Sequence, residues 1–335
     1  METDTPNLSP KIAIIGSGSW ATALIKMITD GGKAIQWWIR NEEKANYIRE
    51  FKHNPDYLSS VEIHPDWVYV DTQLQRVVSS AEIIILAIPS AYLHEALSKV
   101  DLPKNKLYVS AIKGIEPNTQ NVIARYLQEF HQIPENQIGI ITGPCHAEEV
   151  AAEKLSFLTA AASENHVAQQ IADMVKGRYI NVCCNNDLIG AEYAAVMKNI
   201  YAIGAGMVHG LGYGDNYLAL YTSAAIREMD FFLNQISPDH RDVKEAAYLG
   251  DLLVTCYSPF SRNRTFGNML GKGYSASAAQ LEMNMVAEGY FASKLIELQC
   301  VEHNIQLPIA HTVYQVIYEN GNARKLFNQL NNQLN

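Results

Sequence analysis

The stretch KIAIIGSGSWATALIKMI, residues 11–28, decides the fold of this chain. It opens with the apolar run IAII, which is typical of a parallel strand buried on both faces. Gly16, Gly18 and Ala21 then match the turn G-x-G-x-x-G/A, whose small residues let a pyrophosphate approach the backbone where a helix begins. A second apolar strand follows at residues 35–39. We therefore expect a dinucleotide site here rather than an ordinary turn.

The composition indicates a globular protein of two domains. Its 335 residues exceed the usual size of one domain, and 48% of them are hydrophobic. The longest apolar run, residues 83–88, is far too short to cross a bilayer, and the polar residues 1–10 do not resemble a signal peptide. We expect residues 1–10 to form a flexible tail, no membrane partner and a cytoplasmic location. The net charge of -9 argues against a nucleic-acid partner, because phosphate backbones require a basic face.

The cysteines and histidines favour neither disulfides nor a metal site. Five cysteines are an odd number without a C-x-x-C pair, so each is expected to be a buried, reduced thiol. Ten histidines are scattered without an H-x-x-x-H pair, and no metal site is predicted. The cysteines are Cys145, Cys183, Cys184, Cys256 and Cys300.

The rest of the chain divides into a part with strands and a part with helices only. Residues 42–80 carry helical and loop signals, and from residue 188 onward apolar residues recur with the helical period alone. We predict an α/β fold, with a Rossmann-like, doubly wound, mostly parallel sheet in residues 11–186 and an all-α domain in residues 187–335. The further expected strands cover residues 81–89, 106–112, 137–142, 155–162 and 179–184, and the expected helices cover residues 166–175, 188–207, 216–236, 243–257, 276–303, 309–318 and a short segment after 321.

Arg40 bears on the choice of cofactor. It stands just after the second strand, where NAD-binding folds commonly carry an acid for the ribose 2′-hydroxyl. A guanidinium can instead accept a 2′-phosphate, so NADPH should be usable, while Glu42 and Glu43 lie close enough to leave NADH open. A solvated charge on a loop is the alternative interpretation.

Two further segments place cations where an anionic ligand could meet them. Lys113 follows an expected strand, and ligands of open α/β sheets bind beyond such carboxyl ends, which favours a cation facing the substrate over a solvated loop charge. Residues 258–264 carry Arg262, Arg264 and Asn263 beside an expected helix start, a combination suited to a phosphate dianion. A surface loop with unpaired arginines is the alternative.

Lys198 is ambiguous on position alone. It lies with Asn199 in the middle of a helix rich in alanine and glycine, which permits close approach by another helix or a ligand. A lysine among alanines usually extends its charged end to solvent, so the pattern by itself does not favour a catalytic role.

Together these segments resemble the bacterial-type NAD(P)-dependent glycerol-3-phosphate dehydrogenases. The resemblance runs from about Lys11 to the last helices, and several blocks in one order make it specific. The blocks are GSGSWATAL at 16–24, Lys113-Gly114, GPCHAEEV at 143–150, GAEYAAVMKNIYAIGAG at 190–206, GLGYGDN at 210–216, GDLLVTCYSPFSRNRTFG at 250–267 and VAEG at 286–289.

The resemblance implies an enzyme that reversibly transfers a hydride between NAD(P)H and dihydroxyacetone phosphate, giving sn-glycerol 3-phosphate for glycerophospholipid synthesis. It implies a homodimer, with Lys198 as the general acid/base and Lys113 touching both substrate and cofactor. The other residues implied at the substrate are Gly143, Cys145, Asn199, Asp251, Ser261, Arg262 and Asn263. Those implied at the dinucleotide are Gly16, Gly18, Ser19, Trp20, Arg40, Ala147, Arg262, Val286 and Glu288.

The chemistry of the reaction fits a lysine in this role. A ketone that becomes an alkoxide needs a proton donor at its oxygen, and a lysine serves at neutral pH only if its pKa falls from about 10.4. Desolvation among alanines and the like charge of Lys113 both lower the pKa of Lys198, whereas a nearby substrate phosphate raises it.

The sequence departs from the family pattern at two places, and two alternative functions are considered. Cys145 stands where the family usually has Ser or Thr, and residues 217–221 are apolar or aromatic where the family usually has a lysine and later an arginine. A related two-domain dehydrogenase of another hydroxy compound is one alternative, against which Arg262 argues. A non-catalytic NAD(P)H-binding sensor is the other, and it predicts a disrupted catalytic lysine, whereas Lys198 is intact.

Overall fold

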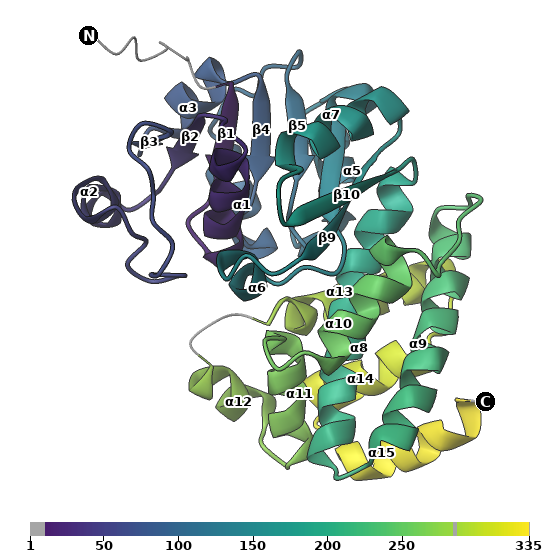
Figure 1. Ribbon diagram of the computed structural model, residues 1–335. Helices are drawn as coiled ribbons and strands as arrows, with labels where there is room; N and C mark the ends of the chain where they lie inside the picture. Colours follow the sequence, from purple (N-terminus) through teal and green to yellow (C-terminus); the bar gives the residue numbers. More distant parts are fainter. Residues whose placement is uncertain (1–10, 284–286, 335) are drawn as a thin grey trace, which may run out of the picture.

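A single eight-stranded sheet forms the first half of the chain (Figure 1). The computed structural model describes residues 11–283 and 287–334. The strand order is β10-β9-β8-β5-β4-β1-β2-β3, and every neighbouring pair is parallel except β8 with β9. The sheet strands are β1 (Ile12–Ile15), β2 (Ile35–Trp38), β3 (Val68–Asp71), β4 (Ile83–Leu86), β5 (Leu107–Ser110), β8 (Ile138–Thr142), β9 (Ser156–Ala162) and β10 (Ile180–Asn185), and a separate hairpin pairs β6 (Ile115–Glu116) with β7 (Asn121–Val122).

The order of the strands reverses at β1, which lies between β2 and β4. Its four residues are all buried, and Ile14 pairs with Trp37 on one side and Ile85 on the other. Gly16 follows the strand with φ +132, and a Cβ there would lie 2.3 Å from the Ala87 carbonyl oxygen. Only glycine fits this turn, which leaves a crevice between the carboxyl ends of β1 and β4 where ligands of such sheets bind.

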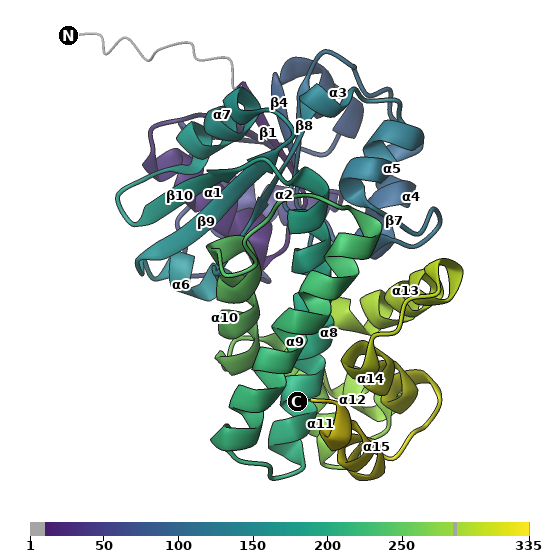
Figure 2. The same ribbon diagram turned by 90° about the vertical axis from the view of Figure 1, so that its right-hand side faces the viewer.

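Helices cover both faces of the sheet, as a doubly wound fold requires (Figures 1 and 2). Helices α1, α2 and α7 pack with the side chains of one face, and α3 and α5 with those of the other. The helices of this half are α1 (Ser19–Asp30), α2 (Glu42–Phe51), α3 (Leu74–Ser80), α4 (Leu93–Leu97), α5 (Ile123–Glu129), α6 (Ala147–Ala151) and α7 (Asn165–Val175).

Helix α8 (Leu188–Gly210) is the centre of the second half. Nearly all of its residues are buried, and it packs against α9, α10, α11, α13 and α14 (Figure 2). Its buried residues belong to the same apolar core as the face of the sheet that carries Ala13 and Ile84, so the core is continuous between the two halves. The other helices are α9 (Asp215–Ile236), α10 (Asp251–Tyr257), α11 (Arg262–Gly271), α12 (Ala276–Glu282), α13 (Glu288–His303), α14 (Pro308–Tyr318) and α15 (Ala323–Leu330).

Glycines let α8 and α11 approach almost backbone to backbone. Gly206 on α8 and Gly267 on α11 each face the main chain of the other helix, and a Cβ on Gly267 would lie 1.8 Å from the Ile203 carbonyl oxygen. Gly210 and Gly271, each four residues further on, repeat the arrangement one turn away. The close approach brings the first turn of α11 beside the middle of α8.

Several expected elements differ in the structure. Residues 68–71 form β3, which the sequence did not reveal because a four-residue edge strand needs only one partner and gives little periodicity. The helix expected over residues 276–303 is two helices, since Met283 and Ala287 are extended. The segment expected to be one helix from residue 243 begins at Ala246 with a π-helical turn (Ala246–Gly250) before α10.

Three smaller corrections concern single residues and segment ends. Cys183 and Cys184 are exposed on the edge strand β10, whereas the other three cysteines are buried as expected. Helix α6 begins at Ala147, so Pro144 of the block at residues 143–150 lies before the helix and not in its first turn. The expected tail at residues 1–10 and the candidate cofactor residue Val286 lie outside the described residues.

The packing of α8 against α11 predicts that Gly267→Ala destabilises the protein. The added methyl group collides with the Ile203 carbonyl oxygen, and overpacking of this kind costs about 1 to 3 kcal/mol in the free energy of unfolding. Gly177→Ala is the matched control, because a Cβ at Gly177 meets nothing within 4 Å. Urea unfolding measures both variants, and equal stability of the two would contradict this account of the packing.

Candidate active site

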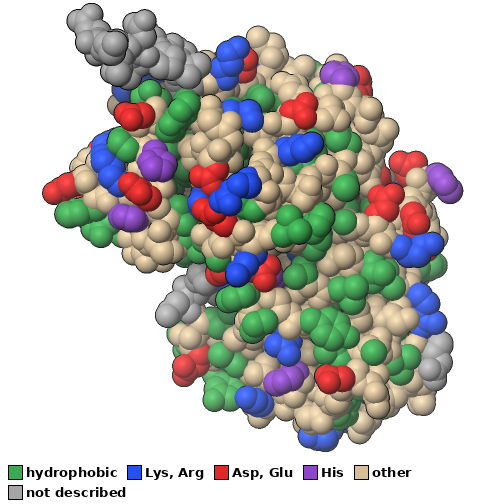
Figure 3. Space-filling view, viewed as in Figure 1, with side chains coloured by type: hydrophobic (Ala, Val, Ile, Leu, Met, Phe, Trp, Pro, Cys, Tyr) green, Lys and Arg blue, Asp and Glu red, His purple; other side chains and the backbone are tan. Residues whose placement is uncertain are grey.

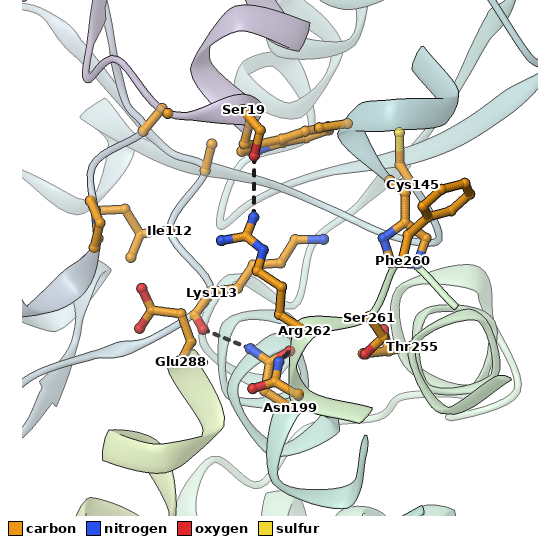
Figure 4. Close-up of a pocket in the computed structure, with 18 of the residues that line it drawn as sticks. Ser19, Ile112, Lys113, Cys145, Asn199, Thr255, Phe260, Ser261, Arg262 and Glu288 are labelled. Carbon is orange, nitrogen blue, oxygen red and sulfur yellow. Dashed lines mark hydrogen bonds between the residues drawn. The ribbon is translucent and has the colours of Figure 1, made fainter. Parts of the chain in front are cut away.

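A cavity of about 400 Å³ lies where the carboxyl ends of the central strands face the helical half (Figure 4). The turn after β1 contributes Gly18, Ser19 and Trp20, and the segments after β4, β5 and β8 contribute residues 87–89, 111–113 and 145–148. The opposite wall comes from α8, α10, α11 and the start of α13. The cavity therefore occupies the crevice at which the strand order reverses.

The structure brings most of the candidate residues to this cavity. Arg40 is exposed on the loop between β2 and α2, away from its lining, and Asp251 is buried behind it. The lining includes the candidates Gly18, Ser19, Trp20, Lys113, Cys145, Ala147, Lys198, Asn199, Ser261, Arg262, Asn263 and Glu288, and it does not include Gly16, Arg40, Gly143 or Asp251.

Asp251 holds two lysines together at the base of the cavity. Its side chain is fully buried, with Oδ1 in contact with Nζ of Lys198 and Oδ2 3.5 Å from Nζ of Lys113. The Thr142 hydroxyl also donates to Oδ2, over 3.4 Å. Lys198 is only 4% exposed, so the interpretation from position alone, in which its charged end extends to solvent, does not hold, because its partner Asp251 is inside the protein.

Burial and charge oppose each other in this cluster. Burial lowers the pKa of Lys198, and the like charge of Lys113 lowers it further. The carboxylate of Asp251 raises the pKa of Lys198, but the pKa remains below its ordinary value. Burial raises the pKa of Asp251, but the two lysines outweigh burial and hold that pKa below its usual range. The site therefore holds an ionised carboxylate beside an ammonium that can lose its proton more readily than a surface lysine.

A chain of amides fixes the segments around the lysines. Asn199 donates from Nδ2 to the Lys113 carbonyl oxygen over 2.9 Å, and Asn263 donates from Nδ2 to Oδ1 of Asn199 over 3.0 Å. The backbone N–H of Gly289 donates to Oδ1 of Asn263 over 2.9 Å. These bonds join the loop after β5 to α8, α11 and α13, so the two asparagines position Lys113 whatever else they contact.

Arg262 reaches across the cavity from the first turn of α11. Ser261 caps that helix by accepting from the backbone N–H of Arg264, and Nη2 of Arg262 donates to the Ser19 hydroxyl over 3.2 Å (Figure 4). Within residues 11–283 and 287–334, Arg262 forms no salt bridge with an acidic side chain. Its remaining N–H groups are available to an anion beside the helix start.

Glu288 closes the cavity from the first position of α13. Ser90, which follows β4, donates its hydroxyl to Oε2 of Glu288 over 2.9 Å. Burial raises the pKa of Glu288. A Cβ at Gly114 would lie 2.5 Å from the Ser90 hydroxyl oxygen and 2.7 Å from Oε2, so a glycine must follow Lys113 for this contact to form.

The surroundings of Lys113 and Cys145, two candidate substrate-binding residues, affect the position of the first and the protonation of the second. Nζ of Lys113 lies 5.6 Å from the centroid of the Trp20 ring and donates to the Gly143 carbonyl oxygen over 3.4 Å, so the strand end and the glycine turn both support it. Burial raises the pKa of Cys145 to about 11, so its thiol stays neutral and can offer only a weak hydrogen bond.

Several residues that line the cavity were not predicted from the sequence. Thr255 lies one helical turn after Asp251, and this i, i+4 spacing was a signal that could have found it. His146 lies inside a quoted block; burial lowers its pKa to about 4, and its Nε2 has no hydrogen-bond partner among the described residues. Tyr57 comes from a segment without any signal. Tyr92 and Phe260 were missed as well.

Fold and site together define a two-domain, nicotinamide-nucleotide-dependent dehydrogenase. The glycine turn at the crevice of a doubly wound sheet suits a dinucleotide, and the buried lysine opposite it suits proton transfer to a carbonyl oxygen. The described helices include none that is both long and apolar enough to span a membrane. Nor do the described residues contain a group of three or more His, Cys, Asp or Glu side chains that could hold a metal ion.

Comparison with known proteins gives the family. Residues 11–168 match NAD-dependent glycerol-3-phosphate dehydrogenase N-terminus, and residues 187–328 match NAD-dependent glycerol-3-phosphate dehydrogenase C-terminus. The chain is 32% identical to the glycerol-3-phosphate dehydrogenase [NAD(P)+] of Staphylococcus saprophyticus, over 92% of this chain and 94% of that protein. It is 33% identical to a second such enzyme, from Salinibacter ruber, over 96% and 94%.

A solved structure agrees with these relatives. The crystal structure of glycerol-3-phosphate dehydrogenase from Coxiella burnetii superposes with a TM-score of 0.88 at 25% identity, covering 95% of this chain and 98% of that one. This chain belongs to the NAD-dependent glycerol-3-phosphate dehydrogenase family. The family match does not favour the two alternatives, a dehydrogenase of another hydroxy compound and a non-catalytic sensor.

The lysine cluster predicts a pH-dependent cost for Asp251→Asn. Near neutral pH the change should lower the free energy of unfolding by about 3 kcal/mol, because it leaves buried ammonium charge unpaired. The folded-state pKa of Asp251 lies below its unfolded value, so its stabilisation is present above the unfolded pKa and is lost as pH falls through the folded one. The difference from wild type should therefore shrink below about pH 4.

Urea unfolding at pH 7 and at pH 3 measures this difference. Asp242→Asn is the control, because the Lys244–Asp242 pair is exposed and such pairs contribute about 0 to 1 kcal/mol. A loss in Asp251→Asn that is no larger than in the control, or that is the same at both pH values, would contradict the prediction.

Proposed function

We propose that this chain transfers a hydride reversibly between NAD(P)H and carbon 2 of dihydroxyacetone phosphate, giving sn-glycerol 3-phosphate, with Lys198 as the general acid/base. The observation that carries the proposal is the convergence of Lys198, Arg262 and the glycine turn on one cavity. The family match supports the choice of substrate. We further propose that the product supplies glycerophospholipid synthesis.

The residues around the glycine turn fit a dinucleotide. Gly18 caps α1 without a side-chain hydrogen bond, so the backbone N–H groups of the first turn are free for a pyrophosphate. We propose that Ser19, Trp20, Ala147 and Glu288 hold the cofactor near these groups, since all four line the cavity. The nicotinamide, when bound, supplies the hydride.

Arg40 is the residue proposed for the 2′-phosphate of NADPH. Its side chain is exposed just beyond β2 and forms no salt bridge within the described residues. Glu42, one of the two nearby acids that left NADH open, accepts from Thr72 over 2.7 Å and from Arg49 over 3.2 Å, so its carboxylate is engaged elsewhere. Glu43, the other acid, is exposed. This arrangement supports binding of NADPH. NADH lacks the 2′-phosphate and could bind without the contact to Arg40.

Lys198 is proposed to move the proton. During reduction its ammonium donates a proton to the substrate oxygen, and during oxidation the neutral amine accepts one from the hydroxyl group. Asp251 stabilises the ammonium, whereas burial and Lys113 favour the amine, so both forms are accessible near neutral pH. Lys113 can at the same time place a positive charge beside the developing alkoxide.

Arg262 and the first turn of α11 are proposed to hold the substrate phosphate. The guanidinium and the free backbone N–H groups of a helix start both favour a dianion. Binding energy gained at the phosphate can orient carbon 2 toward the nicotinamide, since the reacting atoms themselves offer few contacts. Cys145, which lines the cavity, is proposed to border the opposite side of the substrate. Gly143, implied at the substrate by the resemblance, lies outside the lining, and its proposed part is to hold Lys113 through its carbonyl oxygen.

The domain division and the assembly remain proposals as well. We propose that the dinucleotide-binding domain ends at residue 186, between β10 and α8, and that the enzyme acts as a homodimer in the cytoplasm. Apolar side chains gather on the surface of the helical half (Figure 3). The exposed apolar side chains of this half include Phe231 of α9 and Leu253 and Tyr257 of α10. A surface of this kind supports an interface between two copies.

The phosphate site predicts a substrate preference that Arg262 controls. Oxidation of NADPH or NADH, followed by absorbance, should be fast with dihydroxyacetone phosphate and slow with unphosphorylated dihydroxyacetone. Arg262→Ala should raise the KM for the phosphorylated ketone about 10-fold to 100-fold, the effect expected for losing hydrogen bonds to a charged group. The KM for dihydroxyacetone should change little.

Arg264→Ala provides the control, because Arg264 lies on the same helix and does not line the cavity. A normal KM for dihydroxyacetone phosphate in Arg262→Ala would place the phosphate site elsewhere. No oxidation of either cofactor by the phosphorylated ketone would refute the proposed reaction itself.

The acid/base role predicts a loss of turnover in Lys198→Met. Methionine keeps much of the volume but has no proton to give, so kcat should fall by about 100-fold or more. NADPH binding, measured by the fluorescence of the nucleotide, should stay close to that of wild type. Lys272→Met, at an exposed lysine outside the cavity, is the control. Turnover within tenfold of wild type would remove Lys198 from this role.

A further inference from the structure

A buried polar network lies behind the active site, at the start of α8. Asp187 caps this helix by accepting from the backbone N–H of Gly190 over 2.9 Å. Its carboxylate also accepts from Nε of Arg241 over 2.7 Å and from the Tyr248 hydroxyl over 2.7 Å. One carboxylate therefore ties the helix that carries Lys198 to two residues from a distant part of the chain.

The network is almost completely sealed from water. The side chains of Arg241 and Asp187 are 2% and 8% exposed, and Tyr248 is 1% exposed. A Cβ at Gly190 would lie 2.1 Å from Oδ2 of Asp187 and 2.7 Å from Nη2 of Arg241, so the first turn of α8 has no side chain at this point. Hydrogen bonds in such surroundings hold their partners more firmly than bonds at a surface.

Tyr248 connects this network to the lysine cluster. It lies in the π-helical turn (Ala246–Gly250), and Asp251 is the first residue of α10, directly after that turn. A π-helical turn departs from the regular α-helical hydrogen-bond pattern, and such turns are rare and frequently lie at functional sites. The Tyr248 hydroxyl anchors the turn to Asp187, three residues before the carboxylate that contacts Lys198.

The groups that face Asp251 from other elements do not fix its position by themselves. They are Lys198 from α8, Lys113 from the loop after β5, Thr142 from β8 and, further away, His146 from the segment before α6. Two of these are flexible lysine side chains, and the Thr142 contact is long at 3.4 Å. The main chain on both sides of Asp251, namely the π-helical turn before it and α10 packed on α8 after it, therefore sets the position of the carboxylate.

We infer that Tyr248, together with Asp187 and Arg241, is a positioning element that holds the π-helical turn against the start of α8 and so keeps the Asp251 carboxylate against the Lys198 ammonium. The inference rests on the proposed function of Lys198. Tyr248 does not line the cavity and acts only through Asp251, so it is a positioning residue and not a catalytic one.

Tyr248→Phe should shift the pH dependence of turnover in one direction. Loss of the hydroxyl loosens the turn and lets Asp251 move away from Lys198, which removes the charge that favours the ammonium form. Lys198 then loses its proton at a lower pH. Since the ammonium is needed for reduction, the pH at which kcat for dihydroxyacetone phosphate falls should move downward by about 0.5 to 1 pH unit.

Tyr221→Phe is the matched control. Tyr221 is also fully buried in the helical half, and its hydroxyl donates to the Tyr201 carbonyl oxygen over 2.9 Å, away from Asp251. Both variants should lose a similar amount of thermal stability, but only Tyr248→Phe should move the pH profile. The KM values for both substrates should stay within about twofold, since no residue of the cavity is changed.

Asp187→Asn provides a second test, because asparagine still caps α8 but loses its charge toward Arg241. It should move the pH profile in the same direction, and the double variant with Tyr248→Phe should add little further. The inference is overturned if Tyr248→Phe leaves the profile in place or if Tyr221→Phe moves it equally. It is overturned as well if the pH shift of the Asp187→Asn, Tyr248→Phe double variant equals the sum of the shifts of the two single variants. An inactive wild type would instead refute the proposed function.

Discussion

The contact of the buried Asp251 carboxylate with two lysines is the interaction on which the active site depends. Burying an ammonium group without a partner costs several kcal/mol, so Lys198 can stay charged inside the protein only because Asp251 is there. The second lysine, Lys113, keeps the balance from favouring the charged form too strongly. The same three groups therefore stabilise buried charge in the fold and set the proton affinity of the proposed acid.

Close helix packing and side-chain hydrogen bonds fix the elements around this cluster relative to one another. Gly267 and its counterparts let α11 touch the backbone of α8, and Arg262 in the first turn of α11 lines the same cavity as the two lysines. The amides of Asn199 and Asn263 join that pair of helices to the loop that carries Lys113. Because the packing is so close, a small shift of α8 would displace the proposed phosphate site and the proposed proton donor together.

Local patterns in the sequence predicted much of this arrangement. The run IAII and the turn at Gly16 and Gly18 predicted a central strand and its crevice, because their requirements are local: burial on both faces and room for a backbone turn. The position of Lys113 after a strand predicted its place at the cavity for the same reason. The short edge strand β3 and the break between α12 and α13 were missed, since neither has a distinct local pattern.

What the sequence determined by itself is the order of elements, the glycine turn and the family resemblance, all of which are carried by neighbouring residues. Only the tertiary structure decided that Lys198 is buried, because its partner Asp251 lies 53 residues away along the chain. It also decided that Tyr248 bonds to Asp187, a pairing that no periodicity encodes. Contacts between distant residues arise from the packing of whole elements, and the local pattern of residues does not contain them.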